Sequence, residues 1–235
     1  NELKPDVIIT LAYGQLVPQE MLDIPRFGAI NLHGSLLPKY RGAAPIQYAL
    51  INSEKESGMT LMKMVKEMDA GEIYDVEKIK ISEEDNATSL FEKMGDAALT
   101  LILRALPLYL ENKLVGIPQD SSLVSFAPSI KPEEEKIDLS KDKEHIFGLI
   151  RGLSENPGAY LYLEDEKLKI FKAKIYSDDI TGQVGEIIKS DKNGLHIQLS
   201  NGVIAILELQ KEGKKRMDYK SFVNGNPYLL GKILK

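Results

Sequence analysis

The spacing of apolar residues changes once along the chain and divides it into two parts. In the first part, continuous apolar runs at residues 7–10 and 29–33 are typical of strands buried on both faces, as in a parallel sheet. Further strands are predicted over residues 59–65 and 72–81, and helices over residues 18–22, 43–51 and 87–112, the last open to a bend at Pro107. Strands that alternate with helices predict an α/β domain over residues 1–112.

The second part follows a stretch rich in proline and serine, residues 113–130, which we interpret as a linker. A helix is expected from about Lys141 to Leu153, with Ser140 as its N-cap. Apolar runs at residues 160–163 and 168–171 predict a hairpin, and Asn193-Gly194 and Asn201-Gly202 are strong hairpin signals between alternating runs. Short strands at even spacing predict a small antiparallel, OB-like β-barrel domain over residues 131–235.

Composition excludes several classes of protein. The 235 residues are 43% hydrophobic and 28% charged, as in an ordinary globular protein that needs no disulfide or metal to fold. The absence of cysteine rules out disulfide scaffolds, thiol nucleophiles and cysteine-based zinc sites. No apolar run approaches the roughly 20 residues of a membrane span, so we expect a soluble cytoplasmic protein without a membrane partner.

The net charge of −5 is unevenly distributed. Residues 211–235 contain seven basic side chains against Glu212 and Asp218, a net charge of +5. A basic end on an acidic protein is compatible with a polyanionic partner. On charge alone, a solubilising surface is the simpler interpretation.

The densest group of polar residues lies in residues 31–42. Asn31 and His33 are two positions apart on a predicted strand, so both side chains leave the same face. They stand at the carboxyl end of that strand, where open α/β sheets bind ligands, and Gly34 allows a ligand to approach the backbone. An amide donor beside an imidazole suits the oxyanion that develops during acyl transfer. The alternative is a hydrogen-bonded core histidine beside a turn-forming asparagine.

Asp69 is expected at a loop tip after the Met-rich strand, where it could reach a histidine on the neighbouring strand. A carboxylate there would fix the imidazole tautomer or favour the charged ring, although a turn-forming aspartate is the simpler explanation. The sequence has no metal-ligand spacing, no Ser-His-Asp elbow and no phosphate-binding glycine loop.

Together, these segments closely resemble the 10-formyltetrahydrofolate-dependent formyltransferases. The catalytic core of that family is matched by Asn31-x-His33-x-Ser35-Leu36-Leu37-Pro38, by Tyr40-Arg41-Gly42-Ala43-Ala44-Pro45-Ile46-Gln47 and by Asp69-x-Gly71. Its members that act on tRNA are matched by Ala12-Tyr13-Gly14-Gln15, by Leu209-Gln210-x-x-Gly213-Lys214-Lys215-x-Met217 and by Phe222-x-Asn224-Gly225.

The resemblance implies a Rossmann-like catalytic domain followed by a β-barrel that binds tRNA. In the implied reaction, the amino group of methionine on initiator tRNA attacks the formyl carbon of 10-formyltetrahydrofolate, without a metal. Asn31 and His33 would stabilise the oxyanion, and Asp69 would orient His33. The folate site would include Ser35, Leu36, Leu37 and Pro38, together with Tyr13 and Gly14. The tRNA contacts would include Arg41, Lys214, Lys215 and Arg216.

The resemblance also implies an upstream half-domain, because complete members begin with several strands and a Gly-x-Pro-x-Phe loop. We therefore expect an N-terminally truncated catalytic domain, inactive as a fragment, whose parent is monomeric. In the fragment, residues 7–10 would form an exposed sheet edge. Three alternatives remain: a sugar-nucleotide formyltransferase, a formyltetrahydrofolate hydrolase, and an inactive RNA-binding fragment. The basic segment around Gly213-Lys214-Lys215 argues against the first.

Overall fold

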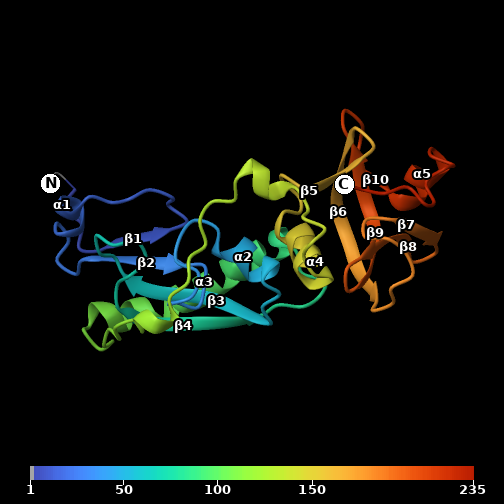
Figure 1. Cartoon of the computed structure of the whole chain (residues 1–235). Coiled ribbons are helices and arrows are strands. Elements are labelled where there is room, and N and C mark those ends of the chain that lie inside the picture. Colours follow the sequence, from blue (N-terminus) through green and yellow to red (C-terminus); the bar gives the residue numbers. More distant parts are fainter. Residues whose placement is uncertain (1–2) are drawn as a thin grey trace. The chain divides into compact units, whose positions relative to one another are not determined.

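The computed structural model describes residues 3–235, which divide into two compact units. The first unit comprises the chain up to Ala49 together with Glu54–Glu84 and Ser89–Ser129. The second comprises Leu50–Ser53, Asp85–Thr88 and Ile130–Lys235 (Figure 1). Among residues 3–235, no helix has both the length and the apolar character needed to cross a bilayer.

The first unit contains a four-stranded mixed sheet in the order β1-β2-β3-β4. Its strands are β1 (Ile8–Leu11), β2 (Ala29–His33), β3 (Glu56–Lys63) and β4 (Ile73–Lys80). The pair β1–β2 is parallel, as predicted for the two apolar runs, whereas β2–β3 and β3–β4 are antiparallel. The α/β class is confirmed. β1 lies at the edge of the described sheet, and its Ile9 and Leu11 are 40% and 52% exposed. The exposed edge expected from the resemblance is therefore confirmed, whereas the burial on both faces predicted from the apolar run is wrong.

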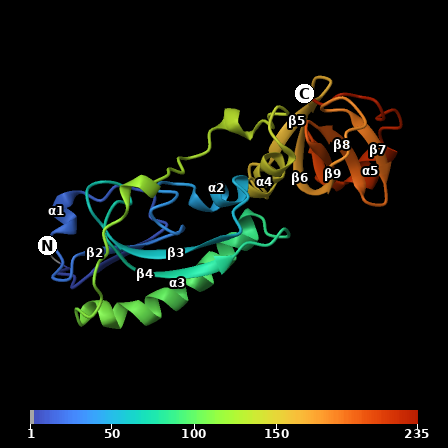
Figure 2. The same cartoon turned by 60° about the horizontal axis from the view of Figure 1, so that its bottom comes forward.

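Three α-helices and a 3-10 helix of the described residues accompany this sheet. They are α1 (Gln19–Leu22), α2 (Pro45–Ile51), α3 (Ala87–Leu110) and the 3-10 helix η1 (Ser121–Leu123). Figure 2 shows α3 running along β3 and β4. Its buried residues, among them Leu90, Met94 and Leu101, recur at helical spacing and form the apolar face. Pro107 lies inside α3, which continues to Leu110.

The second unit is an antiparallel sheet in the order β5-β6-β9-β8-β7, with β10 paired to β9. Its strands are β5 (Ala159–Leu163), β6 (Glu166–Ser177), β7 (Ile187–Asp191), β8 (Gly194–Leu199), β9 (Gly202–Lys211) and β10 (Met217–Asp218). The helices are η2 (Pro132–Glu135), α4 (Lys143–Gly152) and α5 (Tyr219–Asn224). All three predicted hairpins are confirmed. Gly194 and Gly202 adopt φ values of 142° and 147°, which explains the Asn-Gly signal.

Residues 232–235 join the two edges of this sheet. Lys235 exchanges backbone hydrogen bonds with Tyr162 of β5, at 2.7 and 2.9 Å. On the other side, the N–H of Leu234 donates to Gly185 and the N–H of Ile187 donates to Lys232. The predicted barrel is therefore closed by this segment around a core of aliphatic residues from β5 to β9 and α4, with Phe222 of α5.

The start of α4 differs from the prediction. Its N-cap is Asp142, whose carboxylate accepts a 2.7 Å hydrogen bond from the N–H of His145. Ser140 lies in a preceding turn, where its N–H donates to Asp138. The sequence offers two capping residue types two positions apart, Ser140 and Asp142. Ser140 is already bonded in the turn at Asp138, so Asp142 caps the helix.

Candidate active site

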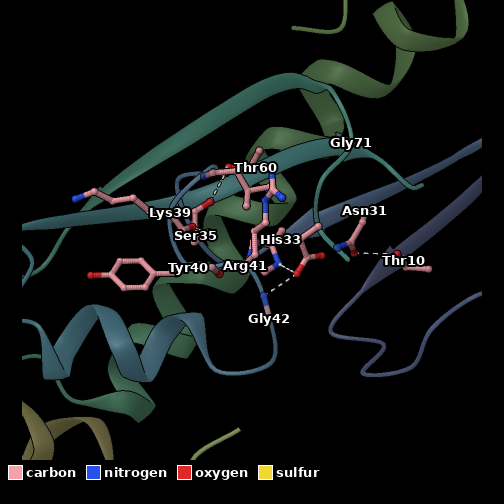
Figure 3. A network of polar contacts seen from close by, with 12 residues as sticks. Thr10, Asn31, His33, Ser35, Lys39, Tyr40, Arg41, Gly42, Thr60 and Gly71 are labelled. Atoms are coloured by element: carbon pink, nitrogen blue, oxygen red, sulfur yellow. Dashed lines mark hydrogen bonds and ion pairs between the residues drawn. The ribbon is translucent and has the colours of Figure 1, made fainter. Parts of the chain in front are cut away.

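Strand β2 carries the two side chains predicted to stabilise an oxyanion. Asn31 and His33 leave the same face near the carboxyl end of β2, as their spacing predicts (Figure 3). β2 pairs with β1 on one side and β3 on the other, so the backbone beneath the site is held by both neighbours. The side chain of His33 is buried, while that of Asn31 is half-buried.

The imidazole of His33 is oriented by two oxygen atoms. Its Nε2 lies 2.9 Å from the carbonyl oxygen of Tyr40. A carbonyl only accepts hydrogen bonds, so Nε2 carries the hydrogen and Nδ1 is the ring nitrogen that faces Asp69. Nδ1 lies 3.6 Å from Oδ2 of Asp69, an ion pair when the ring is protonated. The tautomer therefore makes Nδ1 the atom that gains or loses a proton.

Asp69 is brought to His33 by the loop between β3 and β4. The residue adopts a positive φ of 50°, and its Oδ2 accepts a 2.8 Å hydrogen bond from the N–H of Gly42. This bond joins the loop of Asp69 to the segment that follows β2. The structure thus brings Asn31, His33 and Asp69 to one end of the sheet, from positions up to 38 residues apart in the sequence.

Thr10 is a site residue that the motif analysis missed. Its hydroxyl donates a 2.8 Å hydrogen bond to Oδ1 of Asn31 (Figure 3). With Oδ1 held by Thr10, the amide Nδ2 is directed to the other side, where it can donate to a bound oxyanion. The available signal was the register of the parallel pair, because Thr10 of β1 lies directly opposite Asn31 of β2.

The predicted folate loop, residues 35–38, is hydrogen-bonded to Thr60 of β3. Its hydroxyl donates to the carbonyl of Ser35 at 2.6 Å and accepts from the N–H of Leu37 at 3.2 Å. Ser35 and Leu37 are buried, whereas Leu36 and Pro38 are partly exposed. The first two side chains thus support the loop, and the latter two can contact a ligand.

Tyr13 and Gly14 lie in the segment after β1. Because β1 and β2 are parallel, this segment leaves the same edge of the sheet as the loop that begins at Gly34. Tyr13 is 56% exposed, and a Cβ added to Gly14 would have no atom within 4 Å. Both residues therefore lie on an accessible surface at the edge of the sheet that carries the site.

Arg41 differs from its predicted role as a tRNA contact. The residue is 7% exposed. Its Nε and Nη2 donate to Oε1 of Gln119 at 3.1 and 2.9 Å, and its Nη1 lies 3.4 Å from Glu67. A buried guanidinium needs such partners, and these bonds direct it into the unit rather than towards a phosphate.

The basic residues of the second unit have two different environments. Lys214 and Lys215 are exposed in the turn between β9 and β10. Arg216, by contrast, pairs with Glu155 and Glu208, and its guanidinium lies 4.4 Å from the ring centre of Phe171. All three remain predicted phosphate contacts, the two lysines with exposed side chains and Arg216 with acidic partners. Within residues 3–235, no group of three or more histidine, aspartate or glutamate side chains could hold a metal.

Sequence profiles identify both parts of the chain. Residues 1–106 match the formyl transferase profile, and residues 129–227 match the profile of the formyl transferase C-terminal domain. The methionyl-tRNA formyltransferase of Dictyoglomus thermophilum is 44% identical over 230 residues, which cover 96% of this chain and 73% of that protein. The methionyl-tRNA formyltransferase of Malacoplasma penetrans is 43% identical, with coverage of 100% and 74%.

Solved structures share the fold at lower sequence identity. HypX from Aquifex aeolicus in complex with tetrahydrofolic acid superimposes with a TM-score of 0.69 at 18% identity, over 94% of this chain and 38% of HypX. An N-formyltransferase from Helicobacter canadensis, in complex with folinic acid and dTDP-3-aminofucose, gives a TM-score of 0.66 at 22% identity, over 84% and 72%.

Proposed function

The chain belongs to the formyl transferase family, and from that premise we propose that it formylates the methionine carried by initiator tRNA, with 10-formyltetrahydrofolate as the donor. The reaction is a step of translation initiation. One observation carries the proposal: Asn31, His33 and Asp69 converge at one end of β2, in a chain 44% identical to a methionyl-tRNA formyltransferase.

The three side chains have distinct roles in this mechanism. Attack of the methionine amine on the formyl carbon creates a tetrahedral intermediate with a negatively charged oxygen. Asn31 Nδ2 and the protonated Nδ1 of His33 stabilise that oxygen, and the Asp69 carboxylate stabilises the imidazolium. As the old C–N bond breaks, Nδ1 of His33 gives its proton to the folate nitrogen. The neutral Nδ1 then takes up the proton that the attacking amine releases, which restores the imidazolium.

The two substrates occupy different parts of the chain in this proposal. The folate lies against Leu36, Pro38 and the segment of Tyr13 and Gly14, at the edge where open α/β sheets bind ligands. The domain of residues 131–235 binds tRNA through phosphate contacts of Lys214 and Lys215. Residues 1–112 form the catalytic domain, and the segment predicted as a linker, residues 113–130, belongs to the same compact unit as far as Ser129. We further propose that the protein acts as a monomer in the cytoplasm.

Sugar-nucleotide formyl transfer is the second candidate function, because a structural relative has been solved with an amino-sugar nucleotide. That relative is 22% identical to this chain, whereas the tRNA enzymes are 43–44% identical over nearly the whole chain. The exposed turn at Lys214 and Lys215 further favours a polyanionic acceptor over a small amine.

The test is a transfer assay with the protein expressed from its complete coding sequence. 10-Formyltetrahydrofolate is supplied with methionyl initiator tRNA, with an amino-sugar nucleotide, or with no acceptor. Formyl-methionyl-tRNA as the main product supports the proposal, and its absence refutes it. Formylation of the sugar supports the second candidate, and folate hydrolysis at the same rate without an acceptor indicates a hydrolase. Binding of tRNA without turnover indicates an RNA-binding protein.

A further inference from the structure

Residues 116–127, here called the strap, lie between the two regions matched by family profiles, which end at residue 106 and begin again at residue 129. The strap belongs to the first unit. It forms hydrogen bonds with both segments that carry the candidate site, the loop of Asp69 and the segment after β2. Near its start, Ile117 exchanges two 2.9 Å backbone hydrogen bonds with Ile73, just beyond the loop of Asp69. This end of the strap is therefore fixed to β4.

The other end of the strap holds the segment that follows β2. The N–H of Arg41 donates to Ser125 at 2.9 Å, and the N–H of Ala127 donates back to Arg41 at 2.7 Å. The fit is close at Gly42, where an added Cβ would lie 2.7 Å from the carbonyl oxygen of Ala127 and where φ is 121°. Only glycine suits this position, and Gly42 is the residue whose N–H holds Asp69.

Gln119 lies between these two ends and uses its whole amide. Its Nε2 donates to the backbone carbonyls of Asp69 and Gly71, at 2.7 and 2.8 Å. Its Oε1 accepts from Nε and Nη2 of Arg41. Carbonyls only accept and a guanidinium only donates, so the amide has one orientation that satisfies all four contacts. Figure 3 shows Arg41 and Gly42 close to His33.

We propose that Gln119 is a positioning residue that sets the Asp69 carboxylate against His33. The proposal rests on the proposed function and extends it to the strap. Gln119 ties the backbone of Asp69 to the side chain of Arg41, and Arg41 directly precedes Gly42. The loop of Asp69 and the segment after β2 are thus joined twice: directly by the 2.8 Å bond from Gly42 to Asp69, and indirectly through the Gln119 side chain. Loss of that connection lets the carboxylate move relative to Nδ1 of His33, now 3.6 Å away.

The first experiment compares two substitutions of Gln119 with a control on the same strap. Gln119→Met removes both sets of hydrogen bonds at similar length. Gln119→Glu keeps an acceptor for Arg41 but loses the donors to Asp69 and Gly71. We expect kcat for formyl transfer to fall about 10- to 100-fold in both, because misplacing a reacting group by about 1 Å costs up to 10²-fold, with KM for either substrate within about threefold of wild type.

The control is Asp120→Asn, because the Asp120 side chain bonds Ser122 within η1. Its kcat should equal that of wild type. Gln119 variants that keep wild-type kcat would overturn the proposal. A loss that merely follows the fraction of unfolded protein, measured by thermal unfolding, would show a general structural role and also overturn it.

A second readout does not depend on activity. The chain has only three histidines, His33, His145 and His196, so their ring signals can be assigned in a nitrogen-15 NMR spectrum. In Gln119→Met, we expect the ring-nitrogen signals of His33 to move while those of His145 and His196 stay. Movement of the His33 signals in a protein that formylates no acceptor would retain the positioning role and reject the proposed function. If wild type is active and the His33 signals of Gln119→Met do not move, the positioning role is rejected and the proposed function is not.

Discussion

The charge of Asp69 is the most quantitative part of the proposed mechanism. Its Oδ2 lies 3.6 Å from Nδ1 of His33, and the two side chains are 14% and 7% exposed. If His33 is protonated in the transition state, the two charges interact by about 4–5 kcal/mol at an effective dielectric constant of about 20. Asp69→Asn keeps the size of the side chain and removes the charge. We therefore expect kcat to fall about 10³-fold.

The assay is steady-state formyl transfer to methionyl initiator tRNA, with thermal unfolding of each variant as a check on folding. The control is Asp23→Asn, which makes the same change at an exposed carboxylate that accepts a hydrogen bond from Gln19 on α1. This variant should keep its kcat within about twofold of wild type, because exposed polar contacts contribute little. A folded Asp69→Asn protein with less than about a tenfold loss of kcat would refute the charge interaction, since tenfold is only about 1.4 kcal/mol.

Two further predictions concern the second unit. Replacing Lys214 and Lys215 with alanine should weaken tRNA binding and lower the slope of log K against log salt by about one unit per lost phosphate contact. The control Lys192→Ala, in a different exposed turn, should leave the slope unchanged. An unaltered slope in the double variant would mean that the two lysines only make the surface soluble. The Lys189 ammonium and further hydrogen bonds hold the pKa of the Asp191 carboxyl below its ordinary value of 3.8, so this stabilisation is present above that value and is lost as the pH falls below it. The Tm difference between wild type and Asp191→Asn should be full near about pH 6 and shrink in acid, and a constant difference would contradict the assignment.

Local rules were sufficient for most of the fold. The hairpins at Asn193-Gly194 and Asn201-Gly202 form as predicted, because each glycine supplies a positive φ that other residues rarely adopt. Asn31 and His33 share a face because side chains alternate along a strand. The edge position of β1 and the closure of the barrel by residues 232–235 depend on pairing between distant segments, which periodicity does not encode.

The candidate site was predictable where its residues lie in recognised motifs, Asp69 included, and not where single residues lie outside them. Thr10 lies 21 residues from Asn31, and Gln119 lies 78 residues from Arg41, so neither pairing follows from local spacing. The interpretation of Arg41 changed for the same reason. An arginine in a motif suggests a phosphate contact, but the fold buries this one and supplies Gln119 as its partner. A buried guanidinium requires such a partner, and this requirement connects the strap to the site.

If Gln119 acts through Asp69, the two residues must be coupled. The connection runs from Gln119 Nε2 to the backbone carbonyl of Asp69, at 2.7 Å, and from the Asp69 carboxylate to His33. Removal of the carboxylate leaves Gln119 nothing to position, so Gln119→Met should cause no further loss of kcat in an Asp69→Asn background. Independent contributions would instead multiply, and the double variant would be about 10- to 100-fold slower than Asp69→Asn alone. A multiplicative result would mean that the strap supports catalysis by a route other than the position of Asp69.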